Sequence, residues 1–295
     1  MRRLGRNRGD LLFDSVVVFL MVMLCVITLY PVIYVFSISI SSLSAIEHKD
    51  VWLWPIGFNL SAYKLLLRNE YIPISFMNSV FYTFVGTAYS MLLTVCGAYA
   101  LSRKWLKGRN FFMLLIAFVM LFDGGLIPTY LLIRDLGLLN KRLVMILPAA
   151  VSVWNLIIMR TSMQEIPDSI EESAKIDGAN DLTILFKIII PMVIPVIATI
   201  ALFYCVGKWN AWFNAMIYLS NRKLFPLQLV SRSILTSMTD QALNRSNNLS
   251  GDDFAITPLS FRSALMVVTI IPLLLVYPFI QRFFIKGIMI GSIKG

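Results

Sequence analysis

Six long apolar segments constrain the fold of this chain more than any other feature. Each is long enough to cross the roughly 30 Å hydrocarbon core of a bilayer as a helix. They lie at about 16–39, 75–101, 111–133, 143–163, 191–218 and 259–285. Hydrophobic residues make up 58% of the sequence and charged residues 14%, a balance that soluble globular domains do not reach. We therefore predict an all-α membrane protein with six transmembrane helices packed as a bundle.

Basic residues around the first two segments predict the orientation of the chain. They precede the first segment and fill the short loop after the second (Arg2, Arg3, Arg6, Arg8; Arg103, Lys104, Lys107, Arg109). Since Lys and Arg accumulate in short cytoplasmic loops, both regions are expected inside the cell. We therefore expect a cytoplasmic tail at 1–15, a transmembrane domain at 16–286 and a second cytoplasmic tail at 287–295.

A polar stretch at about 168–180 interrupts the apolar pattern between the fourth and fifth segments. A charged side chain costs roughly 2.5–3.5 kcal/mol in hydrocarbon, so this stretch must lie in water, on the cytoplasmic side. Asp168 or Ser169 is placed to cap a helix, with an acidic residue three positions on. Gly178 is placed to end that helix in the left-handed conformation. We therefore expect about two turns of helix.

The expected helix is amphipathic. By their spacing, Ile170, Ala174 and Asp177 share one face, whereas Glu171, Glu172 and Lys175 lie toward the other. Small residues nearby (Ser173, Ala174, Ala179) would allow close approach to a groove on another protein. The sequence thus predicts a docking helix, with a plain solvated surface helix as the alternative.

The run Glu172-Ser173-Ala174-Lys175-Ile176-Asp177-Gly178-Ala179, followed by Phe186 and Pro191, resembles the EAA loop of permease subunits of bacterial ABC importers. Similarity at 124–130, 136–138 and 287–295 extends the resemblance to the carbohydrate-uptake branch of the maltose and polysaccharide type. Ser173 departs from the usual alanine, a change between small residues. The resemblance implies a MetI-like permease bundle in the bacterial cytoplasmic membrane. It also implies that ATPase coupling involves Glu171, Glu172, Ser173, Ala174, Asp177, Gly178, Ala179 and Pro191.

The same resemblance implies the partners. These are a second homologous permease, two ATP-binding subunits carrying ATP and Mg, and an extracytoplasmic solute-binding protein, with membrane lipid around the bundle. The chain itself lacks a phosphate loop, a zinc-protease motif and a nucleophile elbow. We therefore expect no enzyme activity, no cofactor and no metal in this subunit. The net charge of +10 is spread over tails and loops, which topology and anionic lipid explain without nucleic acid.

Polar residues inside the apolar segments suggest a substrate pathway. Trp209, Asn210 and Asn214 end the fifth segment beside Lys208, while Asp123 and Asn155 lie in the third and fourth. Amides donate and accept hydrogen bonds, aromatic faces suit sugar rings, and polar groups within a membrane tend to face the bundle interior. An interfacial aromatic belt is the alternative for the tryptophan. The long outer loop at about 220–257, with a short helix around 234–238, would face the solute-binding protein in the resembled family.

The substrate is left open by the sequence. Basic residues expected near the outer mouth (Lys208, Arg222, Lys223, Arg232, Arg262) suit an acidic, uronate-containing oligosaccharide, although lipid head groups would explain several of them. A stand-alone channel or secondary transporter is the alternative function. It should show inverted repeats or an intramembrane ion relay, and we find neither in the sequence. Whether the permease pair is a heterodimer or a homodimer is also open.

Overall fold

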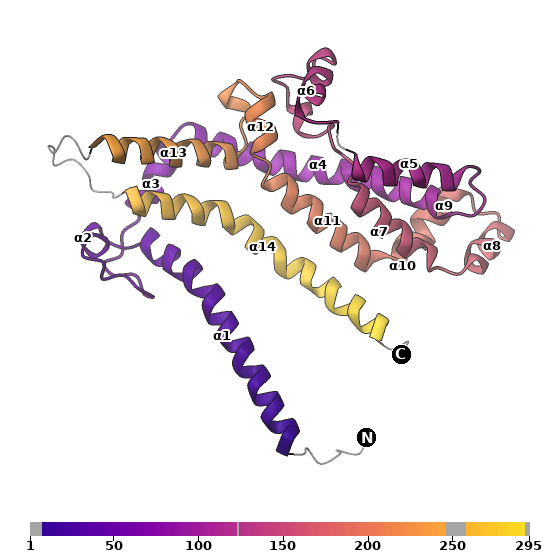
Figure 1. The fold of residues 1–295 in the computed structure, drawn as a ribbon, viewed down its shortest axis with the longest axis horizontal. Coiled ribbons are helices and arrows are strands. Elements are labelled where there is room, and N and C mark those ends of the chain that lie inside the picture. The colour runs from indigo at the N-terminus through magenta and orange to yellow at the C-terminus, as the bar shows by residue number, and fades with distance from the viewer. Residues whose placement is uncertain (1–7, 123, 246–257, 293–295) are drawn as a thin grey trace. The chain divides into compact units, whose positions relative to one another are not determined.

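The computed structural model describes residues 8–122, 124–245 and 258–292, and all regular structure within these ranges is helical (Figure 1). The prediction of an all-α chain is therefore confirmed for the described residues. The chain divides into two compact units. One comprises the residues up to Asn69 together with Ile234–Ile270, and the other Glu70–Ser233 together with the residues from Ile271.

The first unit contains α1 (Arg8–Ser39), α2 (Leu43–Glu47), α3 (Ser61–Arg68), and parts of α13 (Leu227–Arg245) and α14 (Pro258–Ser292). The end of α1 is tied to the segment that follows it. Ser37 Oγ donates to the carbonyl of Leu53 at 2.7 Å, and Ser39 Oγ lies 2.8 Å from the hydroxyl of Tyr63. A small apolar cluster at this end includes Ile38 and Val51. The remainder of α1 exposes apolar side chains, as a helix facing lipid or another membrane protein would.

The second unit is built around α4 (Tyr71–Ser102), which packs on α7 (Val153–Gln164) and α11 (Ile194–Trp209). The unit also contains the start of α13, the end of α14, and the shorter elements α5 (Arg109–Leu121), α6 (Leu126–Asp135), η1 (Arg142–Met145), α8 (Asp168–Ile176), α9 (Asp181–Ile184), η2 (Leu185–Ile189), α10 (Ile190–Met192), α12 (Phe213–Tyr218) and η3 (Arg222–Leu224). Ala98, Met159, Met163, Ile184 and Ile189 are completely buried where these helices meet. This core holds the polar stretch around α8 against the ends of α4 and α7.

Three helices of the described chain are long and apolar enough to cross a membrane, at Leu12–Ser39, Tyr71–Ser102 and Pro258–Pro278. Two further spans would follow if each of two bent helix pairs counts as one, α5 with α6 and Asp181–Met192 with α11. The second pair bends by 87°. By length and composition the structure therefore supports three to five of the six predicted spans.

The predicted fourth span, 143–163, is wrong as a continuous helix, because α7 begins only at Val153. Ahead of it the backbone leaves the helical conformation at Ala149, whose φ is +50°, directly after Pro148. A proline lacks the amide hydrogen and disfavours a helical residue before it. Ser152 then caps the shorter helix by accepting from the backbone N–H of Asn155 at 3.4 Å.

Two other boundaries also differ from prediction. The fifth segment, predicted at 191–218, divides into α10, α11 and α12, with breaks at Val193 and after Trp209. The predicted outer loop at 220–257 contains the 19-residue helix α13 rather than a short helix around 234–238. Residues 246–257 of that loop lie outside the described ranges.

Candidate functional site

The polar helix α8 forms and ends as its sequence predicts. Gly178 has φ +81°, and its N–H donates to the carbonyl of Lys175 at 3.0 Å while Ala179 donates to Ala174 at 2.9 Å. These two bonds make a Schellman motif, in which a left-handed residue satisfies the last carbonyls of a helix. No atom outside its neighbours lies within 4 Å of where a side chain would start at Gly178. The requirement for glycine therefore comes from the backbone conformation and not from crowding.

The predicted side-chain cap at the start of α8 is wrong. The cap position is Pro167, and no side chain accepts from the first turn. The carboxylate of Asp168 instead accepts from Lys104 Nζ at 2.6 Å, and this bond holds the pKa of Asp168 below its usual value. Lys104 comes from the loop between α4 and α5, so the acid is used for a contact between elements. Both side chains are exposed, and the pair contributes little to stability.

Glu171 is buried together with Ala174, which contradicts its predicted place on the face of α8 opposite Ala174. Its Oε2 lies 2.7 Å from Arg103 Nη1, with the two side chains only 8% and 5% exposed. Its Oε1 lies 2.9 Å from Lys175 Nζ and accepts weakly from Trp105 Nε1 at 3.4 Å. Because Arg103 is buried at the end of α4, the carboxylate turns inward to neutralise it, as buried charges require.

The arginine is itself fixed by the core. Its guanidinium lies 4.9 Å from the centre of the Tyr99 ring, and Nη2 donates to the carbonyl of Met163 at 3.4 Å. The pair with Glu171 therefore joins α8 to the ends of both α4 and α7.

The opposite face of α8 is open and mixed in character. Glu172, Ser173, Ile176 and Asp177 are exposed, whereas Ala174 is buried against the core. Ile176 is 86% exposed although it is apolar. Ala179 is half-buried, and Pro191 is exposed in α10. An exposed isoleucine among acidic and small residues is suited to contact with another protein.

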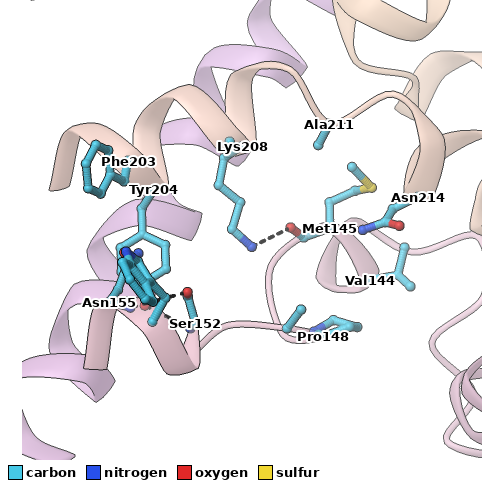
Figure 2. A pocket seen from close by; sticks show the side chains of 13 residues that line it. Val144, Met145, Pro148, Ser152, Asn155, Phe203, Tyr204, Lys208, Ala211 and Asn214 are labelled. Carbon is cyan, nitrogen blue, oxygen red and sulfur yellow. Dashed lines mark hydrogen bonds between the residues drawn. The ribbon is translucent and has the colours of Figure 1, made fainter. Parts of the chain in front are cut away.

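A cavity of about 460 Å³ lies between α11, the start of α7 and the turn at 142–152 (Figure 2). Its lining contains three of the predicted pathway residues, Asn155, Lys208 and Asn214. Lys208 Nζ points into the cavity and donates to the carbonyls of Met145 and Ile146 at 3.4 and 3.5 Å. The lining of the cavity is therefore partly apolar, and its polar groups include one cation and two amides.

The remaining predicted pathway residues do not line this cavity. Trp209 is buried against Phe76 of α4, with ring centres 6.0 Å apart, and Asn210 accepts from Gln228 Nε2 at 3.0 Å. Each residue of a helix turns about 100° from its neighbour, so Trp209 faces α4 and not the cavity, and Asn210 follows at the end of α11. Asp123 lies outside the described residues.

Two polar lining residues escaped the sequence analysis, Tyr204 and Ser152. The Tyr204 hydroxyl lies 2.7 Å from Thr94 Oγ1 and accepts from the N–H of Ser152 at 3.0 Å, which connects α11 to α4 and α7. Tyr204 stands four residues before Lys208, so the i, i+4 spacing was the signal that could have identified it.

Only one of the basic residues predicted at the outer mouth lines the cavity. Arg222 lies 5.9 Å from the ring centre of Tyr71, and Arg232 lies 3.7 Å from that of Trp212. Lys223 is exposed, and Arg262 belongs to the other unit. Of these five basic residues, Lys208 is therefore the one that lines the cavity.

Comparison with known proteins gives consistent matches. Residues 107–290 match the family described as binding-protein-dependent transport system inner membrane component. The chain is 43% identical to the polygalacturonan/rhamnogalacturonan transport system permease protein YtcP of Bacillus subtilis (strain 168), covering 96% of this chain and 99% of that protein. It is 30% identical to the arabinooligosaccharides transport system permease protein AraQ of Halalkalibacterium halodurans, covering 75% and 74%. A crystal structure of a bacterial ABC transporter involved in the import of the acidic polysaccharide alginate has a chain with TM-score 0.85 and 37% identity, covering 95% of this chain and 99% of that one.

Proposed function

Because this chain belongs to the family of inner membrane components of binding-protein-dependent transport systems, as residues 172–179 predicted, we propose that it is the permease subunit of an ATP-driven importer of acidic oligosaccharides. The observation that carries the substrate class is a cavity in which Lys208 is flanked by the amides of Asn155 and Asn214. The relatives named for polygalacturonan and for the acidic polysaccharide alginate support the same class.

The proposed assembly follows from the resemblance of residues 172–179 to the EAA loop of ABC importer permeases. A second homologous permease completes the pathway, and a solute-binding protein delivers the oligosaccharide from outside to the region at 220–257. Two ATP-binding subunits carry ATP and Mg and contact the exposed face of α8. The exposure of the apolar Ile176 on that face supports this part of the proposal. This chain performs no chemistry. In the proposed topology, six spans cross the cytoplasmic membrane, and the tails at 1–15 and 287–295 are cytoplasmic.

Transport in proteoliposomes tests this function against the channel alternative. The complex is copurified with its partner subunits from native membranes and supplied with its solute-binding protein. Uptake of labelled trigalacturonate is then measured with ATP, without ATP, and with a non-hydrolysable analogue. ATP-dependent accumulation against a gradient is the expected result. Equal uptake under all three conditions would establish a channel, in which α8 is only a cytoplasmic helix.

Replacing each of the two amides in the fifth predicted segment tests whether the substrate contacts the cavity or the residues around it. We expect Asn214→Leu to lower uptake roughly two- to tenfold, since one hydrogen bond to a substrate hydroxyl is worth about 0.5–1.5 kcal/mol net. Asn210→Leu, which loses only the contact with Gln228, should keep nearly normal uptake. Initial uptake rates, divided by the amount of protein in the membrane, provide the measurement. Equal losses in both variants would show that the cavity does not contact substrate.

A further inference from the structure

The side chain of Lys208 packs against a glycine on a neighbouring helix. Gly86 lies on α4, and a Cβ atom there would come within 3.2 Å of Lys208 Cδ and 3.3 Å of Cε. Real Cβ contacts are rarely this short, so a side chain at 86 would require the lysine stem to shift by a few tenths of an ångström. The absence of a side chain at Gly86 therefore allows the stem to pass along α4 before the ammonium enters the cavity.

Inside the cavity, the Lys208 ammonium makes only long hydrogen bonds. Its contacts with the carbonyls of Met145 and Ile146, at 3.4 and 3.5 Å, are at the long end of hydrogen-bond distances. Among the residues that the structure describes, no carboxylate lies within ion-pair distance of Lys208. An ammonium has three donors, and removing it from water without an anion costs free energy. A ligand carboxylate would supply that anion.

Neutral polar groups lie on both sides of the ammonium. Figure 2 shows Asn155, Ser152 and Tyr204 on one side of Lys208 and Asn214 on the other. Amide groups can both donate to and accept from sugar hydroxyls. Trp154, which also lines the cavity, is 58% exposed and offers an aromatic face. The volume of about 460 Å³ falls within the range of about 300–1,000 Å³ typical of small-molecule sites.

From this arrangement we propose that Lys208 binds the carboxylate of one uronate unit as the oligosaccharide passes through the cavity, and that Gly86 positions the lysine for this contact. The proposal rests on the proposed function and adds a subsite to it. A single ammonium matches a single carboxylate, so the subsite distinguishes a charged sugar unit from a neutral one. The amides on either side then recognise hydroxyl groups, which charged and neutral sugars share.

The test compares two oligosaccharides of one length, trigalacturonate and its fully methyl-esterified form, which carries no carboxylate, taken up by the same reconstituted complex with the same solute-binding protein. Selectivity of the solute-binding protein cancels when each variant is divided by the wild type. We expect Lys208→Gln to lower the uptake ratio of acidic to esterified substrate roughly tenfold, the scale of a charge-assisted hydrogen bond. Lys208→Arg, which keeps the charge, should restore most of the ratio. Lys223→Gln removes an exposed charge outside the cavity and should not change it.

A second pair of variants tests the lysine without altering it. Gly86→Ala should lower the same ratio, because its Cβ displaces the lysine stem. Gly97→Ala on the same helix is the matched control, since its nearest neighbour, Leu156 Cδ1, lies at 3.4 Å, and it should leave the ratio unchanged.

The outcomes separate the inference from the function on which it rests. Wild-type uptake of the acidic trimer with an unchanged ratio in Lys208→Gln would overturn the subsite alone. An equal loss of uptake for both substrates in Lys208→Gln would also overturn the subsite, because Lys208 would then only support the turn at 145–146. Failure of the wild type to take up either trimer would overturn the proposed substrate class, and the subsite with it.

Discussion

Glu171→Ala is expected to destabilise the junction of α8 with α4 and to abolish substrate-stimulated ATP hydrolysis. The substitution leaves Arg103 buried without its carboxylate, and breaking a buried ion pair from one side typically costs about 3–5 kcal/mol. Lys175 and Trp105 lose their contacts with Glu171 at the same time, and Lys175 keeps the longer contact with Asp181 at 3.6 Å. Thermal unfolding of the purified protein in detergent measures the stability, and reconstituted ATPase assays measure the coupling.

The neighbouring acid provides a matched control for this prediction. Glu172 is exposed on the opposite face of α8, so Glu172→Ala should change stability by no more than about 0.5 kcal/mol, as surface substitutions usually do. A double variant, Arg103→Ala with Glu171→Ala, should be less destabilised than the sum of the single variants, since neither charge is left unpaired. Equal melting temperatures for Glu171→Ala and Glu172→Ala would show that the buried pair does not hold α8.

Local signals explain why α8 could be predicted from the sequence and its anchor could not. The polar stretch and Gly178 lie within one short segment, and the Schellman motif needs only those residues. The partner of Glu171 is Arg103, at the end of α4, and no periodicity within α8 reveals a contact so distant in sequence. The spacing within α8 placed Glu171 on the face opposite Ala174, because it carries no information about a buried cation on another helix.

The cavity shows the same limit. The polar residues noted within the apolar segments include Lys208, Asn155 and Asn214, which the fold brings to one cavity. Residues 143–152, which supply the carbonyls facing Lys208, were predicted as part of a helical span because most of them are apolar. The shape of this turn depends on Pro148 and on the left-handed Ala149, a conformation that alanine adopts only where the surrounding fold imposes it.

Gly178→Val is expected to lower substrate-stimulated ATPase activity roughly tenfold or more while the protein still accumulates in the membrane. A non-glycine residue in the left-handed region costs about 1–3 kcal/mol, and a β-branched one is disfavoured further. The Schellman bonds of Gly178 and Ala179 would break, and the chain leaving α8 would take another direction. In the proposed assembly this changes the surface presented to the ATP-binding subunits.

A second glycine makes the prediction specific to α8. Gly137 ends α6 in the same motif, with φ +65° and bonds from Gly137 to Arg134 at 2.8 Å and from Leu138 to Ile133 at 3.1 Å. It has similarly open surroundings, so Gly137→Val imposes a comparable strain at another helix end. We expect Gly137→Val to retain most of the substrate-stimulated ATPase activity. Gly178→Asn should also retain it, because asparagine tolerates positive φ. Full stimulation in Gly178→Val would mean that coupling does not depend on how α8 ends.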